Sequence, residues 1–188
     1  MSSAILQGGA SGSGSMTLLA PSTNSNQIIT MPDSTGTMLT TGSPQSGGVI
    51  QVVQVTNNTT YSVNSTTLTA TGFIGSITPK FSTSKILVSI NGGQFRYSPT
   101  AGQEMWLQLY RSIGGGAYSS TQGDIQEIVI SPANSIISVP HSLLYLDSPA
   151  TTSAVSYQPY LKSNSGPVTT YFNLSSCYVT MTLMEIAA

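Results

Sequence analysis

The protein has 188 residues, of which 6% are charged and 39% are hydrophobic, and its net charge is −1. This length suits one domain with an appendage, and the hydrophobic share is too high for a disordered chain. The near-neutral charge offers no general attraction to nucleic acid or to anionic lipid, and no apolar run reaches the roughly 18 residues of a membrane-spanning helix. We therefore expect neither nucleic-acid binding nor membrane insertion.

The first 48 residues are poor in apolar side chains. Residues 1–15 end in GGASGSGS, which has the composition of a flexible linker, and they lack the basic start and long apolar stretch of a signal peptide. Residues 17–42, TLLAPSTNSNQIITMPDSTGTMLTTG, indicate two short extended pieces, and SPQSGG at 43–48 indicates a hinge. We expect an N-terminal arm (1–15), a short β collar with its hinge (16–48) and a folded domain (49–188).

From Val49 onwards, short β-branched and aromatic runs alternate with turn residues, which predicts about eight strands and no amphipathic helix. Asn91-Gly92 is a favoured tight-turn pair and predicts the end of the strand that starts at Lys85. Cys177 is the only cysteine, so no disulfide forms within the chain. The predicted fold is all-β, with a jelly-roll-like β-sandwich. The strands are expected at 49–55, 67–79, 85–93, 104–112, 124–131, 136–149, 153–163, 169–175 and 177–187, and the segment around Tyr61 and Val63 is expected to be a polar turn.

In two of these expected strands, the side chains on the two sides differ clearly. In the strand at 177–187, one side is expected to carry Cys177, Val179, Met181 and Leu183, and the other side Tyr178, Thr180 and Thr182. In the strand at 104–112 the two expected faces are Met105, Leu107 and Leu109 on one side and Trp106, Gln108 and Tyr110 on the other. A tryptophan in the middle of a strand usually packs in the core, so we expect a core position for Trp106 and keep ligand contact as the alternative.

No residue pattern predicts catalysis. His141 is the only histidine, it follows Pro140, and no G-x-S-x-G nucleophile motif is present. Glu104, Asp124 and Glu127 are the only acids close in sequence, and the last two are three residues apart, so on a strand they face opposite sides. One histidine, one cysteine and scattered acids give no metal-ligand spacing, although a calcium site built from carbonyl oxygens stays open. We expect no enzyme activity, no cofactor and no metal.

Aromatic side chains are the more promising functional residues. Tyr97, Trp106, Tyr110 and Tyr118 lie near polar or glycine-rich turns. Sugar-binding surfaces commonly combine exposed rings with amide and guanidinium groups. The residues expected to contact a receptor are Arg96, Tyr97, Arg111 and Tyr118.

Residues 12–42, GSGSMTLLAPSTNSNQIITMPDSTGTMLTTG, resemble a recurring element of fibre and minor structural proteins of tailed bacteriophages, especially those of marine bacteria and cyanobacteria. The matching positions include Thr23, Asn24, Pro32, Asp33 and Gly36. The later segments VIQVVQV, ITPKFSTSKILV, YLDSPATTSAVSYQPYLKS and VTMTLMEIAA look like the C-terminal domain of such fibres. The resemblance covers nearly the whole chain, although the long shaft that such fibres often carry is almost missing here.

The resemblance implies a homotrimer located on the virion, in which the N-terminal strands of three chains interlace before the sandwich knob. The arm would dock on other virion proteins of the tail, neck or capsid, and the knob would bind a host-surface glycan or protein. A collar with so few apolar residues can bury them only between chains. The expected trimer-interface residues are Ile28, Ile29, Met31, Met38 and Leu39.

Three other functions stay open. One is a head or neck fibre, or a capsid decoration protein, without a receptor role. A bacterial lectin-like module is the second. A glycan depolymerase is the third, but it would need a larger β-helical body with a carboxylate groove, which the sequence does not indicate.

Overall fold

The structure is a computed structural model that describes residues 44–97, 104–121, 126–130, 137–163, 169–174 and 177–188, together with the single residues 22, 26, 28 and 42. The chain divides into two units, Met1–Met38 and Leu39–Ala188, and the second contains every strand described below. No α-helix occurs in the described ranges, and they accordingly include no helix that could cross a membrane.

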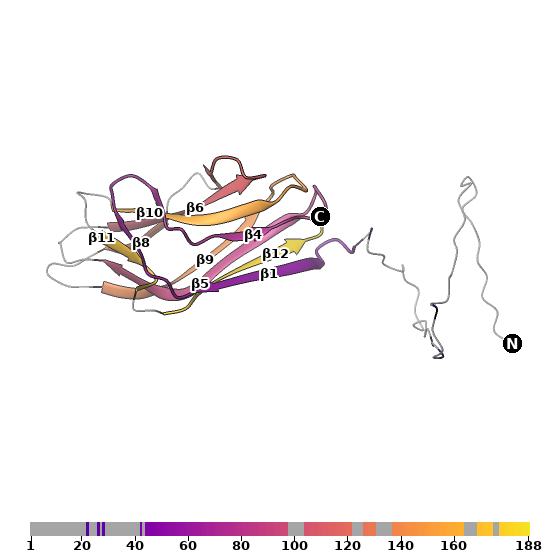
Figure 1. The fold of residues 1–188 in the computed structure, drawn as a ribbon, viewed down its shortest axis with the longest axis horizontal. Helices are drawn as coiled ribbons and strands as arrows, with labels where there is room; N and C mark the ends of the chain where they lie inside the picture. Colours follow the sequence, from indigo (N-terminus) through magenta and orange to yellow (C-terminus); the bar gives the residue numbers. More distant parts are fainter. Residues whose placement is uncertain are drawn as a thin grey trace. The chain divides into compact units, whose positions relative to one another are not determined.

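Two antiparallel sheets form a β-sandwich, as the sequence predicts (Figure 1). Sheet I contains β1 (Val49–Asn57), β2 (Tyr61–Asn64), β5 (Lys85–Tyr97), β9 (Ile137–Asp147), β11 (Thr169–Phe172) and β12 (Val179–Ile186). Sheet II contains β3 (Thr69–Ala70), β4 (Gly75–Ile77), β6 (Glu104–Ile113), β7 (Ser119–Ser120), β8 (Gln126–Ile130) and β10 (Val155–Ser163).

Each sheet is organised around long central strands. In sheet I, β5 lies between β12 and β9, and β11 joins it near its end. In sheet II, β6 and β10 pair with each other over nine residues, and the four shorter strands pair with their outer edges. The predicted strands are all present in part, and the strand predicted at 67–79 is divided into β3 and β4. The short strands β2, in a segment predicted to be a polar turn, and β7 were missed by the sequence analysis.

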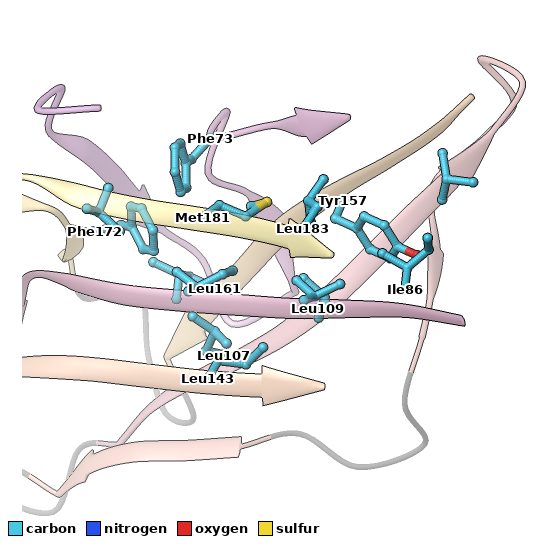
Figure 2. Close-up of a cluster of buried hydrophobic side chains, with 14 of the residues drawn as sticks. Phe73, Ile86, Leu107, Leu109, Leu143, Tyr157, Leu161, Phe172, Met181 and Leu183 are labelled. Atoms are coloured by element: carbon cyan, nitrogen blue, oxygen red, sulfur yellow. The ribbon is translucent and has the colours of Figure 1, made fainter. Parts of the chain in front are cut away.

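The core fills the space between the sheets. Side chains alternate along β6, β10 and β12, so one side of each of these strands is buried against the opposite sheet while the other side faces outward. Figure 2 shows this cluster of buried side chains, contributed by strands of both sheets. Its largest members are Phe73, Ile86, Ile90, Met105, Leu107, Leu109, Leu143, Tyr157, Leu161 and Phe172.

The turn predicted at Asn91-Gly92 is wrong, because β5 continues through it to Tyr97. Gly92 and Gly93 both have positive φ, and the register with β9 shifts between Gly92 and Phe95, so the segment is a β-bulge. A Cβ on Gly92 would lie 2.8 Å from the carbonyl oxygen of Tyr178. Glycine favours tight turns because it has no side chain and adopts positive φ. At Gly92 the same two properties let the backbone of β5 approach the backbone of Tyr178 closely.

Glu185 is a fully buried acid that holds the turn before β5. Its Oε1 accepts hydrogen bonds from the backbone N–H of Lys80 (2.7 Å) and Phe81 (3.2 Å), and its Oε2 accepts one from Nε2 of Gln51 (2.6 Å). Burial by itself raises the pKa of Glu185, but these hydrogen bonds favour the charged form and leave the pKa below its ordinary value. The carboxylate therefore stabilises the fold in its ionised state.

The substitution Glu185→Gln tests this role. It should lower the free energy of unfolding by about 1–3 kcal/mol at pH 7, because charge-assisted hydrogen bonds are lost in a buried place. Since the pKa is lower in the folded chain than in the unfolded one (about 4.3), the stabilisation is present above that pH and is lost as the pH falls through the folded-state pKa. Urea unfolding between pH 3 and 7 measures both effects. Glu104→Gln, on a partly exposed acid, is the matched control, and an equal loss in both variants would contradict the prediction.

Candidate ligand-binding face

The outward side of β6 and β10 has a different composition from the inward side. The register places Trp106 opposite Lys162, Gln108 opposite Tyr160, and Tyr110 opposite Gln158. The residues between them, including Met105, Leu107, Leu109 and Leu161, are completely buried in the core. Because the same two strands supply both sides, packing of the core also determines which rings face outward.

Three tyrosines gather on this side. The rings of Tyr110 and Tyr160 are stacked with their centroids 4.0 Å apart and an interplanar angle of 21°. Tyr118, from the connection between β6 and β7, is tilted against Tyr160 at 6.2 Å. Stacking covers one face of each ring, and all three rings are half-buried, so ring edges and hydroxyl groups are available to a ligand.

Two buried glutamines are the cross-strand neighbours of the stacked tyrosines, with Gln108 opposite Tyr160 and Gln158 opposite Tyr110. Gln108 is 6% exposed and Gln158 is 4% exposed, although both belong to the outward side. Nε2 of Gln108 donates a hydrogen bond of 2.5 Å to Oγ of Ser120 on β7. Because both glutamines are buried, they pack beside the rings and are not accessible to a ligand, which would contact the tyrosines instead.

Trp106 extends this surface along β6. Nζ of Lys162 lies 5.5 Å from the centre of its ring, which is a cation–π contact, and its Nε1 donates to Oε2 of Glu104 at 2.9 Å. One cation and one anion therefore flank the indole. We call the whole surface the aromatic face and define it by Trp106, Tyr110, Tyr118 and Tyr160, with Glu104 and Lys162 at one end.

The hydroxyl groups of Tyr118 and Tyr160 stay neutral in ordinary conditions. Burial raises the pKa of Tyr118, although a hydrogen bond with Ser156 opposes the rise. Burial also raises the pKa of Tyr160, with a further contribution from the neighbouring Tyr118 and Tyr110. The surface therefore presents uncharged phenols that donate and accept hydrogen bonds. Such a surface can bind a ligand through ring contacts and hydrogen bonds without any chemical step.

The prediction of a core position for Trp106 is wrong. The indole is half-buried on the outward side of β6, and the alternative of ligand contact stays a prediction. The alternation predicted for residues 105–110 is confirmed, but alternation alone does not say which side of a strand meets the second sheet. Tyr160 was not among the predicted residues, and only its register opposite Gln108 shows that it stacks on Tyr110.

The four predicted receptor-contacting residues do not lie together. Tyr118 belongs to the aromatic face, whereas Arg96 and Tyr97 lie at the end of β5 in sheet I, where the side chain of Tyr97 is outside the described residues. Arg111 projects from the inward side of β6 and forms a salt bridge with Asp147 of β9.

The salt bridge of Arg111 connects the two sheets. Asp147 is 3% exposed, and its Oδ2 also accepts a hydrogen bond of 2.8 Å from the hydroxyl of the buried Tyr157. The hydrogen bond that Arg111 donates to Asp147 raises the pKa of Arg111, and burial raises the pKa of Tyr157. Neither group therefore loses its proton. Arg111 and Tyr157 belong to sheet II and Asp147 to sheet I, so this cluster stabilises the sandwich.

The remaining candidate chemical groups form no site within the described residues. No group of three or more His, Cys, Asp or Glu side chains there could hold a metal ion. Asp124 and the side chains of Glu127 and His141 lie outside the described residues. A cavity of about 200 Å³ lies away from the aromatic face, and its described lining, which includes Phe81, Ser84 and Ala187, contains no charged side chain.

Comparison with known proteins identifies no family. Neither a protein-family model nor a curated protein sequence matches the chain. Similar solved structures include particles of infectious bursal disease virus. The structure of the Gx strain has 13% sequence identity and a TM-score of 0.35, and the match covers 73% of this chain and 40% of that one. For the Gt strain the identity is 12%, the TM-score 0.35 and the coverage 76% and 39%, and for a T13 particle the identity is 10%, the TM-score 0.36 and the coverage 73% and 36%. The chain spans at most 40% of the length of these structures. Similarity at this level defines neither a family nor a function.

The substitution Arg111→Met tests the structural role of this arginine. It should lower the free energy of unfolding by about 3 kcal/mol, because it leaves the buried carboxylate of Asp147 without its cation. The matched control is Arg96→Met, at the end of β5, which should change stability by about 0.5 kcal/mol or less. Urea unfolding at pH 7 gives both values. Equal, small effects would mean that Arg111 is not needed to hold the sheets together.

Proposed function

We propose that this chain is a structural component of a virus particle, a short fibre that attaches the particle to a host surface through a glycan bound on the aromatic face. Binding involves no chemical step and no cofactor. The observation that carries the proposal is the stack of Tyr110 and Tyr160, with Tyr118 and Trp106 beside it, on the outer side of a rigid pair of central strands.

The ligand class follows from the chemistry of this surface. Aromatic rings pack against the apolar C–H side of a pyranose, and phenol hydroxyls, Glu104 and Lys162 can hydrogen-bond to the ring hydroxyls. Among the described side chains of this surface, the charges of Lys162 and Glu104 balance each other, which favours a neutral sugar over a polyanion. Trp106, Tyr110 and Tyr160 stand on strands of the sheet, so little conformational entropy of these three side chains is lost on binding.

The location on a virus particle is supported by the resemblance of residues 12–42 to the fibre element of tailed bacteriophages. The same resemblance supports a homotrimer with an N-terminal arm docked on another virion protein. Ile28 is 88% exposed in the single chain, which leaves an apolar side chain in water that a three-chain collar would bury. Ile29, Met31, Met38 and Leu39, the other predicted interface residues, lie outside the described residues.

Glycan binding by the full chain tests the proposal. On an array of bacterial surface polysaccharides and neutral oligosaccharides, the wild-type protein should bind a subset of glycans. Tyr160→Ala should weaken that binding roughly tenfold or more, because removal of one stacked ring costs more than about 1.4 kcal/mol of contact energy. Tyr110→Ala should have a similar effect.

The matched control is Tyr178→Ala, which removes a tyrosine that is 68% exposed just before β12 in sheet I. It should leave binding unchanged. Thermal melts show whether each variant folds. A wild-type protein that binds no glycan, or folded Tyr160→Ala protein that binds normally, would contradict the proposal and leave a decoration protein without a receptor role as the better interpretation.

A further inference from the structure

The rings of the aromatic face form two groups along the strand pair. Tyr160 stacks on Tyr110 with the ring centroids 4.0 Å apart, and Tyr118 is tilted against Tyr160, so these three rings form one group. Trp106 is four residues before Tyr110 on β6, and both side chains are on the outward side. At about 3.3 Å per residue, the two strand positions are about 13 Å apart. We call the three tyrosines the tyrosine platform and Trp106 the tryptophan platform.

The surface between the two platforms offers little contact to a ligand. Gln108 is midway between Trp106 and Tyr110 on β6, and it is only 6% exposed. Its amide group is held by the hydrogen bond that it donates to Ser120. Tyr160, opposite Gln108 on β10, leans toward Tyr110, because the two rings are stacked. The ring contacts along β6 are therefore interrupted, and a ligand that uses both platforms must cross the buried glutamine.

The polar groups beside Trp106 favour binding of a sugar there. Nζ of Lys162 is 5.5 Å from the ring centre, and Glu104 accepts a hydrogen bond from the indole Nε1. An ammonium group and a carboxylate can each hydrogen-bond to sugar hydroxyl groups, and the indole between them supplies the apolar contact. Trp106 is therefore a second contact point in its own right and not an extension of the tyrosine platform.

The distance between the platforms exceeds the length of one sugar. A pyranose unit, built from single bonds of about 1.5 Å, lengthens a glycan chain by about 5 Å. Units two or three positions apart in an extended chain are accordingly about 10–15 Å apart, which matches the spacing of about 13 Å between the platforms. A monosaccharide or a disaccharide can therefore contact one platform but not both.

The surface beside the tyrosine platform is open. Ala70 of β3 is paired with Tyr160, and Ser120 of β7 is paired with Tyr110. Both of these neighbours are exposed, and their side chains are much shorter than a tyrosine ring, so these two residues form no wall next to the rings. Recognition of a chain end needs a pocket that encloses the last sugar, whereas an open row of rings suits sugars within a chain.

We infer that the ligand of the aromatic face is the interior of an extended glycan chain, in which sugars at least two positions apart contact the two platforms at once. The inference rests on the proposed function, because it takes the ligand of this face to be a neutral glycan. Each platform alone holds a sugar weakly. When one chain is held at the first platform, its effective concentration at the second is high, and the overall affinity can exceed that of either contact by about a hundredfold or more.

The dependence of binding on chain length tests the inference with the unmodified protein. The probes are oligosaccharides of one to eight units, prepared by partial hydrolysis of the polysaccharide that the full chain binds most tightly on the glycan array. Titration calorimetry should show an affinity that rises roughly a hundredfold between two and about four units. Equal affinity for one unit and for eight units would overturn the inference, because a single sugar would then account for binding.

Tryptophan fluorescence gives a second readout, because Trp106 is the only tryptophan of the chain. Its emission therefore reports contact with the tryptophan platform alone. Oligosaccharides of four or more units should change the emission in proportion to the bound fraction that calorimetry gives. A long oligosaccharide that binds tightly and leaves the emission unchanged would contradict the inference.

Two variants separate the platforms. Trp106→Ala and Tyr160→Ala should each lower the affinity for the longest oligosaccharide roughly tenfold or more, because either change leaves one platform. Only one of the two variants should weaken binding of the disaccharide, which reaches a single platform. Tyr178→Ala is the matched control and should leave the whole series unchanged, and thermal melts show whether each variant folds.

The outcomes distinguish this inference from the proposed function. Folded Trp106→Ala protein that binds every oligosaccharide normally, while Tyr160→Ala weakens binding of all of them, would overturn the inference and leave the proposed function intact. A wild-type chain that binds neither polysaccharide nor oligosaccharide would contradict the proposed function itself, and the inference with it.

Discussion

The register between β6 and β10 is the constraint on which the rest of this structure depends. Met105, Leu107 and Leu109 of β6 and Leu161 of β10 fill the core from one side of this strand pair. A shift of one residue in either strand would exchange these side chains with tyrosine, tryptophan and glutamine. The burial of a few aliphatic side chains therefore determines where the rings on β6 and β10 lie, because the same register places both sets of side chains.

Buried polar clusters secure the two sheets around that core. The carboxylate of Asp147 accepts hydrogen bonds from Arg111 and Tyr157 across the sandwich, and Glu185 holds the backbone that leads into β5. The chain has few charged residues, and three of them are used in these contacts. Among the described residues, the charged side chains on the outward sides of the sheets include Lys85, Glu104 and Lys162, and the opposite charges of Glu104 and Lys162 lie together beside Trp106.

The two outward sides of the sandwich differ in chemistry. Sheet II carries the rings of the aromatic face, on which we propose that a sugar binds, whereas sheet I carries a row of aliphatic side chains. In the homotrimer that we propose, several weak sugar sites would act together, which would raise the strength of attachment without tighter binding at any single site.

The sequence by itself determined the all-β class, most strand positions and the alternation in β6, because hydrophobic periodicity is a local property. The receptor contact that it predicted for the rings near β6 stays a prediction. The sequence could not decide which rings meet, since the stack of Tyr110 on Tyr160 joins residues fifty positions apart through strand register. Likewise, Arg111 was expected on the surface, and only the approach of β9 shows that Asp147 pairs with it inside. The bulge at Gly92 and the aliphatic row from Val52 to Leu146 were undetermined for the same reason. Pairing between distant strands is set by the packing of the whole domain, and no short stretch of sequence contains it.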